Sequence, residues 1–131
     1  MTVVLDTNVY SDWRRYGHWN ESISTADRVI VPAIVIGELR VGFLRGGKRG
    51  ENEQKLDDFL RLAVVQVGVV GDATSQHYAI LKNHLSTQGT PIPEADVWIA
   101  AVAMECSGRL LTRDGHFDNL PQVRRAVVEE R

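Results

Sequence analysis

Four acidic side chains stand where an apolar run ends or begins, and they are the residues of this sequence best suited to chemistry. They are Asp6 in VVLDTN, Glu38 in VIGELR, Asp96 in IPEADVWIAA and Asp114 in LLTRDGHF. Two carboxylates about 5 Å apart repel by roughly 3 kcal/mol at an effective dielectric constant near 20. Four of them gathered in one place must therefore take up protons, move apart or bind a cation.

We expect these four side chains to bind a divalent metal ion. Mg²⁺ or Mn²⁺ suits a site of carboxylate and water oxygens, whereas Zn²⁺ prefers nitrogen and sulfur ligands. Such an ion lowers the pKa of a water molecule and shields the charge that grows on a phosphoryl group. The chemistry that this predicts is metal-assisted attack of water on a phosphodiester.

The segments that must position the acids alternate between short β-branched runs and amphipathic helical stretches. Apolar residues recur at helical spacing between the β-branched runs, as at Leu56, Phe59 and Leu60. Strands separated by helices predict crossover units and hence an α/β fold with a mostly parallel sheet. The predicted strands are residues 2–5, 28–31, 64–67, 110–112 and 123–128.

These predicted elements place two of the acids after strands and the other two on helices. Asp6 and Asp114 follow predicted strands, and ligands bind at the carboxyl ends of strands in open α/β sheets. Glu38 lies one helical turn after Ile34. Asp96 falls in the first turn of a helix that starts after Pro93 and is apolar nearly all round, so this helix should be buried. A charged group there is costly unless it is paired or bound to a metal.

Each acid taken singly also has an ordinary structural interpretation. Asp6 suits the N-cap of the helix that follows it. Glu38 suits a surface ion pair with Arg40 or Arg45. Asp96 suits an exposed first turn, and Asp114 with its following glycine is a turn signal. The functional interpretation depends on the four acids together, because acids gathered in a cleft mark functional sites.

Length, composition and charge limit the class of protein to which this chain can belong. The 131 residues suit one compact domain over residues 1–131, and no apolar run approaches the roughly 18 residues of a membrane span. The start lacks a secretory signal pattern and Cys106 is the single cysteine, which favours a cytoplasmic protein without membrane contact. The net charge of −2 argues against a broadly basic nucleic-acid-binding surface, although arginines occur in local runs.

Several other features are assigned structural roles. Residues 46–50, with three glycines, predict a flexible loop between two helices. The histidines, including His116, show no zinc-like spacing with Cys106, and Cys106 is interpreted as a core residue. Aromatic residues near the amino end, such as Trp13 and Trp19, suit either an interface or the core.

The four acidic segments resemble the PIN-domain ribonucleases, particularly the VapC-type toxins of toxin–antitoxin modules. LDTNVYSDW, PAIVIGELRVGF, IPEADVWIAAVA and LLTRDGHF stand in the order and spacing of that family and cover nearly the whole chain. The opening LDTN and the D-x-x-I-A-A of residues 96–101 are the most specific parts. The resemblance implies a three-layer α/β/α sandwich that gathers the four acids in one groove and cleaves RNA with Mg²⁺ or Mn²⁺.

The resemblance also implies roles for individual residues. Asp6 and Asp96 would be direct metal ligands, and Asp114 would bind a second metal or act through water. Glu38 would position the metal-bound water. Asn8 and Thr112 match supporting polar positions, whereas the nearby acids Glu94 and Asp118 receive no role. Basic residues near the groove would hold the RNA backbone, with Arg40, Arg45, Lys48 and Arg113 as candidates.

The family pattern further implies products and partners. Attack by water, and not by the ribose hydroxyl, leaves 5′-phosphate and 3′-hydroxyl ends. A cognate antitoxin would fill the groove, and the toxin would form a homodimer. Two alternatives stay open from the residues. One is a magnesium-dependent phosphohydrolase of the haloacid-dehalogenase type, although Asn8 stands where that class has a second Asp; the other is a non-catalytic PIN-like binding module.

Overall fold

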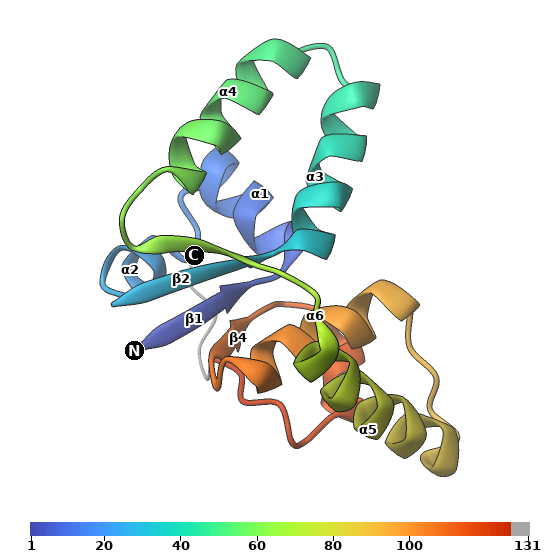
Figure 1. Ribbon diagram of the computed structural model, residues 1–131. Helices are drawn as coiled ribbons and strands as arrows, with labels where there is room; N and C mark the ends of the chain where they lie inside the picture. Colours follow the sequence, from blue (N-terminus) through green and yellow to red (C-terminus); the bar gives the residue numbers. More distant parts are fainter. Residues whose placement is uncertain (127–131) are drawn as a thin grey trace.

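A parallel sheet lies between two sets of helices in the computed structural model, which describes residues 1–126 (Figure 1). The four strands are β1 (Thr2–Leu5), β2 (Arg28–Pro32), β3 (Val65–Gly68) and β4 (Arg109–Leu111). They pair in the order β3-β2-β1-β4, and every pairing is parallel. The predicted mostly parallel α/β sheet is therefore confirmed.

The helices form the two outer layers of the sandwich. Figure 1 shows α1 (Thr7–Tyr16), α3 (Ala33–Arg45) and α4 (Arg49–Leu60) on one side of the sheet. The helices α5 (Asp72–Gln88) and α6 (Glu94–Glu105) lie on the other side and pack against each other. A short α2 (Asn20–Ser24) precedes β2, and a 3₁₀ helix η1 (Gly115–Asn119) follows β4. The predicted α/β/α sandwich is confirmed.

The core consists of the central strands and the helix faces that cover them. Val3, Val4 and Leu5 of β1 are at most 1% exposed, as expected for a strand covered on both faces. In α6, Ile99 and Ala100 are fully buried, and Val97, Ala101, Val102 and Ala103 are buried as well, which confirms the prediction of a buried helix after Pro93. The first turn of α6 thereby presents Asp96 at the edge of the core.

The strand boundaries differ from the predicted ones by a residue or two. β1 is as predicted, whereas β2 continues through Pro32 and β3 is shifted by one residue. β4 ends at Leu111, so Thr112 lies just beyond the strand. Of the fifth predicted strand, residues 127 and 128 lie outside the described residues. In the described part, Arg125 makes an isolated parallel bridge with Leu110.

The connection between α3 and α4 is shorter than the predicted loop of residues 46–50. Gly46 caps α3 and α4 already begins at Arg49, so Arg49 and Gly50 are helical. Helix packing outweighs the low helix propensity of glycine here. Arg40 of α3 pairs with Glu53 and, at 3.6 Å, with Asp57, both on α4. These ion pairs connect the two helices of the hairpin.

Other predicted features of single residues are also settled. Cys106 is the half-buried C-cap of α6, at the rim of the core. Trp19 is 1% exposed and belongs to the core, and Trp13 packs against Phe59 with a ring-centroid distance of 5.0 Å. Within residues 1–126, no helix combines the length and the hydropathy that crossing a membrane requires.

Candidate metal centre

Asp6 is the most deeply placed of the four acids. It follows β1 directly and caps α1, and its carboxylate accepts hydrogen bonds from the Thr7 N–H at 2.8 Å and from Thr112 Oγ1 at 2.7 Å. Asp6 is 5% exposed. Burial, and to a lesser extent the charges of Asp114 and Glu38, raise the pKa of Asp6 against the lowering effect of the two hydrogen bonds.

Asp96 lies in the first turn of α6 and faces the same region. Its side chain is 13% exposed. Burial raises the pKa of Asp96, and the nearby charges of Asp6 and Asp114 add to the increase, while a hydrogen bond with His116 opposes it. The environment therefore opposes the charge of both Asp6 and Asp96, which is the electrostatic condition that a bound cation relieves.

Asp114 stands at the start of η1, beyond the end of β4. Its carboxylate accepts the backbone N–H of His116 at 2.9 Å, and its own N–H donates to Thr112 Oγ1 at 3.0 Å. Because the Thr112 hydroxyl also donates to Asp6, it connects two of the acids. The turn interpretation and the site interpretation of Asp114 both hold.

Glu38 reaches the site from α3. It is exposed, and its Oε1 accepts a hydrogen bond from Thr7 Oγ1 at 2.5 Å. Within residues 1–126, Glu38 forms no ion pair with Arg40 or Arg45: Arg40 pairs with Glu53 and Asp57 of α4, and the hydrogen bond of Glu38 is with Thr7 of α1. Its position at the rim explains why it raises the pKa of Asp6 only weakly.

The structure thus brings together Asp6, Glu38, Asp96, Asp114 and Thr112 around the carboxyl ends of β1 and β4. Asn8 is less well placed. It is exposed on α1 and, within the part of the chain that the structure describes, makes no hydrogen bond to any of the four acids.

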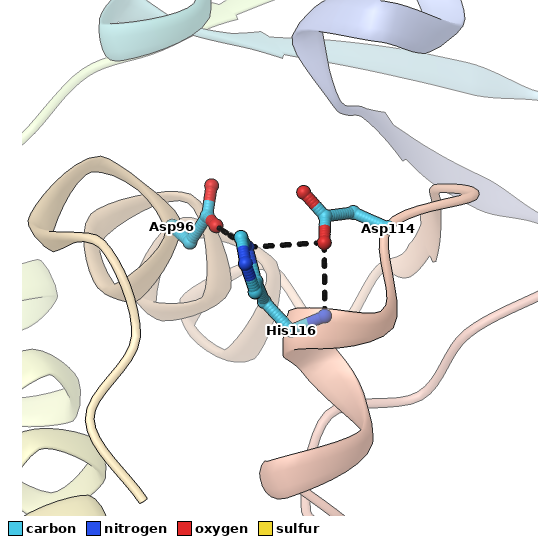
Figure 2. A group of neighbouring side chains, drawn as sticks. All are labelled: Asp96, Asp114 and His116. Carbon is cyan, nitrogen blue, oxygen red and sulfur yellow. Dashed lines mark hydrogen bonds and ion pairs between the residues drawn. The ribbon is translucent and has the colours of Figure 1, made fainter.

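His116 belongs to the site, although its sequence spacing did not indicate this. Figure 2 shows its imidazole between the carboxylates of Asp96 and Asp114. The Nδ1 atom lies 2.8 Å from Asp96 Oδ2 and 3.0 Å from Asp114 Oδ1, and one donor atom from each residue lies within 4.8 Å of the others. The hydrogen bond with Asp96, followed by the charges of Asp114 and Asp96, raises the pKa of His116.

Thr7 is a second residue that the sequence analysis missed. Its backbone N–H holds Asp6 and its hydroxyl holds Glu38, so one residue at the start of α1 orients two acids. The sequence signal that could have indicated Thr7 and His116 was their closeness along the chain to two of the acids. Thr7 directly follows Asp6, and His116 stands two residues after Asp114.

The remaining acids near the site are engaged in ion pairs. Glu94 binds Lys82 at 2.6 Å and also accepts a hydrogen bond from the Tyr78 hydroxyl, which joins α5 to α6. Asp118 pairs with Arg125 at 2.6 Å. These contacts give both acids structural partners.

The basic residues expected near the groove have different surroundings. Arg113 pairs with Asp12 of α1 at 2.6 Å and thereby ties the segment after β4 to that helix. Arg40 is occupied by α4, and Arg45 is exposed at the end of α3. Lys48 lines a hollow of about 390 Å³ between α1, α3 and α4, together with Arg14, Arg15 and Lys55.

The donor set fits a hard divalent cation. Carboxylate oxygens from Asp6, Asp96 and Asp114 converge, and hydroxyl or amide groups of Thr7 and Thr112 fix the orientation of the deepest one. Oxygen ligands of this kind are those that Mg²⁺ and Mn²⁺ take in proteins. Burial first, and the neighbouring carboxylates second, raise the pKa of Asp6 and of Asp96, and a cation bound between them would favour their charged forms.

Comparison with known proteins gives a match to a protein family over most of the chain. The model of the PIN domain matches residues 3–123. Ribonuclease VapC5 of Mycobacterium tuberculosis is 31% identical over 114 residues, which are 87% of this chain and 84% of that protein.

Solved structures agree with this match. The structure of VapBC-1 from nontypeable Haemophilus influenzae superposes with a TM-score of 0.85 at 23% identity and covers 96% of this chain and 97% of that one, which shows the shared fold. VapBC-5 from Mycobacterium tuberculosis, a member of the VapBC family of toxin-antitoxin systems, gives a TM-score of 0.73 at 28% identity. That superposition covers 97% of this chain and 98% of the other.

Proposed function

Because this chain belongs to the PIN-domain family, we propose that it is a metal-dependent endoribonuclease and the toxin of a toxin–antitoxin pair. The observation that carries the proposal is the convergence of Asp6, Asp96 and Asp114 at the carboxyl ends of β1 and β4. The substrate is RNA, as the relatives named ribonucleases support.

The metal is Mg²⁺ or Mn²⁺, held by Asp6, Asp96 and Asp114. When bound, such an ion activates water for attack on phosphorus and offsets the charge that develops on the phosphate oxygens. Thr112 keeps the Asp6 carboxylate directed at the site, because its hydroxyl is itself fixed by the N–H of Asp114. Asn8 stays a prediction as a supporting residue; within residues 1–126 it makes no hydrogen bond to the four acids.

Glu38 acts on the water. It is the exposed carboxylate of the group, and the Thr7 hydroxyl holds it beside the buried acids. From this position it orients the attacking water and accepts its proton. Since water attacks, and not the ribose hydroxyl, the products carry 5′-phosphate and 3′-hydroxyl ends.

The protein partner is a cognate antitoxin. Structures similar to this chain are of VapBC toxin-antitoxin systems, which supports the pairing. The acidic groove suits a basic side chain of the partner, because a cation of either kind relieves the repulsion between the carboxylates. A homodimer stays a prediction, which light scattering on the purified protein would test.

Cleavage of defined RNAs tests the proposed function. The full chain, separated from its antitoxin, is incubated with structured and unstructured labelled RNAs and Mn²⁺ or Mg²⁺, and the new 5′ ends are sequenced. We expect cleavage with 5′-phosphate ends, none with EDTA, and none by the double variant Asp6→Asn, Asp96→Asn. The variant Asp58→Asn, at an exposed position of α4, is the matched control and should cleave like the wild type.

Equal levels of intact RNA with the wild type and the double variant would make the chain a non-catalytic binding module. The phosphohydrolase alternative predicts a different observation, namely transient labelling of Asp6 as an aspartyl phosphate. It is not favoured, because that class has a second Asp where this chain has Asn8.

A further inference from the structure

We infer that His116 is a ligand of the metal, beside Asp96 and Asp114, and that its imidazole shifts the preference of the site from Mg²⁺ toward Mn²⁺. The inference rests on the proposed function, since it requires a divalent ion in the acidic groove. It concerns His116, which is not one of the four acids that the sequence pattern singles out.

The position of the Nδ1 atom is the first argument. In octahedral coordination with metal–ligand distances of about 2.1 Å, neighbouring ligand atoms are about 3 Å apart. The Nδ1 atom lies 2.8 Å from Asp96 Oδ2 and 3.0 Å from Asp114 Oδ1 (Figure 2). The imidazole nitrogen therefore stands at the spacing of adjacent ligands from each of the two oxygens, and all three atoms lie within 4.8 Å of one another.

The rigidity of η1 is the second argument. Phe117 within the 3₁₀ helix and Leu120 at its C-cap are fully buried and anchor it in the core. The N–H of His116 donates to the Asp114 carboxylate, and the N–H of Asp114 donates to Thr112. His116 is thus held by the same backbone turn that orients Asp114, which is the kind of preorganisation that a ligand position requires.

Access is the third argument. The His116 side chain is 49% exposed, so an ion from solvent can reach the space that it shares with the two carboxylates. A neutral imidazole offers a softer donor than water or carboxylate and favours first-row transition metals over Mg²⁺, which also gives up water reluctantly. Replacing one oxygen ligand by Nδ1 therefore changes which metal is preferred.

Electron spin echo spectroscopy of bound Mn²⁺ tests the assignment directly. The full chain, freed of antitoxin, is loaded with Mn²⁺, and nitrogen-14 coupling from a coordinated imidazole is recorded. We expect this coupling in the wild type and in His77→Gln, a control on α5, and expect its loss in His116→Gln. In His116→Gly, added imidazole should restore it.

Calorimetric titration gives the second readout. For His116→Gln the Mn²⁺ affinity should fall by about 10–100-fold, as for other changes around metal sites. The Mg²⁺ affinity should fall much less, so the ratio of the two affinities changes. His77→Gln should leave both affinities as they are.

The outcomes separate the inference from the proposed function. If the wild type binds Mn²⁺ without nitrogen coupling, or His116→Gln weakens both metals equally, His116 is a charge partner of Asp96 and Asp114 and the inference is overturned while the nuclease proposal stands. If the wild type binds neither metal any better than the Asp6→Asn, Asp96→Asn double variant does, the metal site itself fails and both are overturned.

Discussion

At the scale of single residues, Asp6 shows how a functional group is kept at a cost to stability. Its carboxylate is buried beside other acids, and this burial raises its folded-state pKa above the ordinary value of an aspartate. An acid whose pKa is raised on folding destabilises the protein when ionised. That penalty is present at neutral pH, shrinks as the pH falls through the folded-state pKa, and is gone below the ordinary pKa that the carboxyl has in the unfolded chain.

Asp6→Asn should therefore stabilise the metal-free protein. At pH 7 with EDTA we expect a gain of about 1 kcal/mol in the free energy of unfolding, or a few degrees in Tm, because an ionised buried carboxylate is replaced by a neutral isostere. The gain should shrink on acidification, since the wild-type carboxyl then takes up a proton. Thermal unfolding at several pH values measures this, with Asp58→Asn as control; a lower Tm for Asp6→Asn at pH 7 would contradict the assignment.

Thr112 connects Asp6 and Asp114, and Thr112→Val removes both of its hydrogen bonds while keeping its shape. We expect RNA cleavage to fall by about 10–100-fold, as for other groups that orient metal ligands. Measured cleavage rates at saturating Mn²⁺ check this. Thr87→Val, at an exposed position of α5, is the control, and an unchanged rate for Thr112→Val would show that Asp6 needs no such support.

At the scale of elements, the site depends on where strands end and helices begin. Asp6 stands between β1 and α1, Asp96 in the first turn of α6, and Asp114 between β4 and η1. Parallel strands direct their carboxyl ends to the same edge, so residues far apart in the chain meet there. The end of α5 is equally important, because the chain must leave this helix at Gly89 for α6 to begin at Glu94 and hold Asp96 in its first turn.

Gly89 makes that termination possible through its positive φ of 75° at the C-cap of α5. Gly89→Ala should lower the free energy of unfolding by about 1 kcal/mol, because a side chain disfavours this left-handed conformation. Gly42→Ala is the matched control. Gly42 is exposed inside α3 with open space around it, so alanine there should stabilise by about 0.5–1 kcal/mol.

Denaturant unfolding of the two variants measures the difference between them. Equal effects of the two alanines would mean that the end of α5 does not depend on the left-handed glycine.

At the scale of the whole molecule, a metal that binds only the folded protein must raise its stability. At a concentration 100 times Kd the gain is about 2.7 kcal/mol. We expect Mn²⁺ or Mg²⁺ to raise the Tm of the wild type, EDTA to reverse the change, and the double variant Asp6→Asn, Asp96→Asn to show none. A rise of the same size in the double variant would locate metal binding elsewhere.

Much of the architecture is predictable from the sequence because strands and helices follow local patterns. The β-branched run before Asp6, the apolar stretch after Pro93 and the glycine at position 89 each specify their element within a few residues. The short connection before Arg49 was not predictable in this way, since packing between α3 and α4 decides it.

The site, too, has a part that the sequence predicts and a part that depends on the tertiary structure. The sequence by itself determined the types of the four acids and their places at strand ends and helix starts, and these residue types already call for a cation. Only the tertiary structure decided which other residues contact these acids, such as His116 between Asp96 and Asp114, or Thr7, whose hydroxyl donates a hydrogen bond to Glu38. The physical reason is range: secondary structure is encoded by near neighbours, whereas contacts between α1, α3, α6 and η1 exist only after the layers pack.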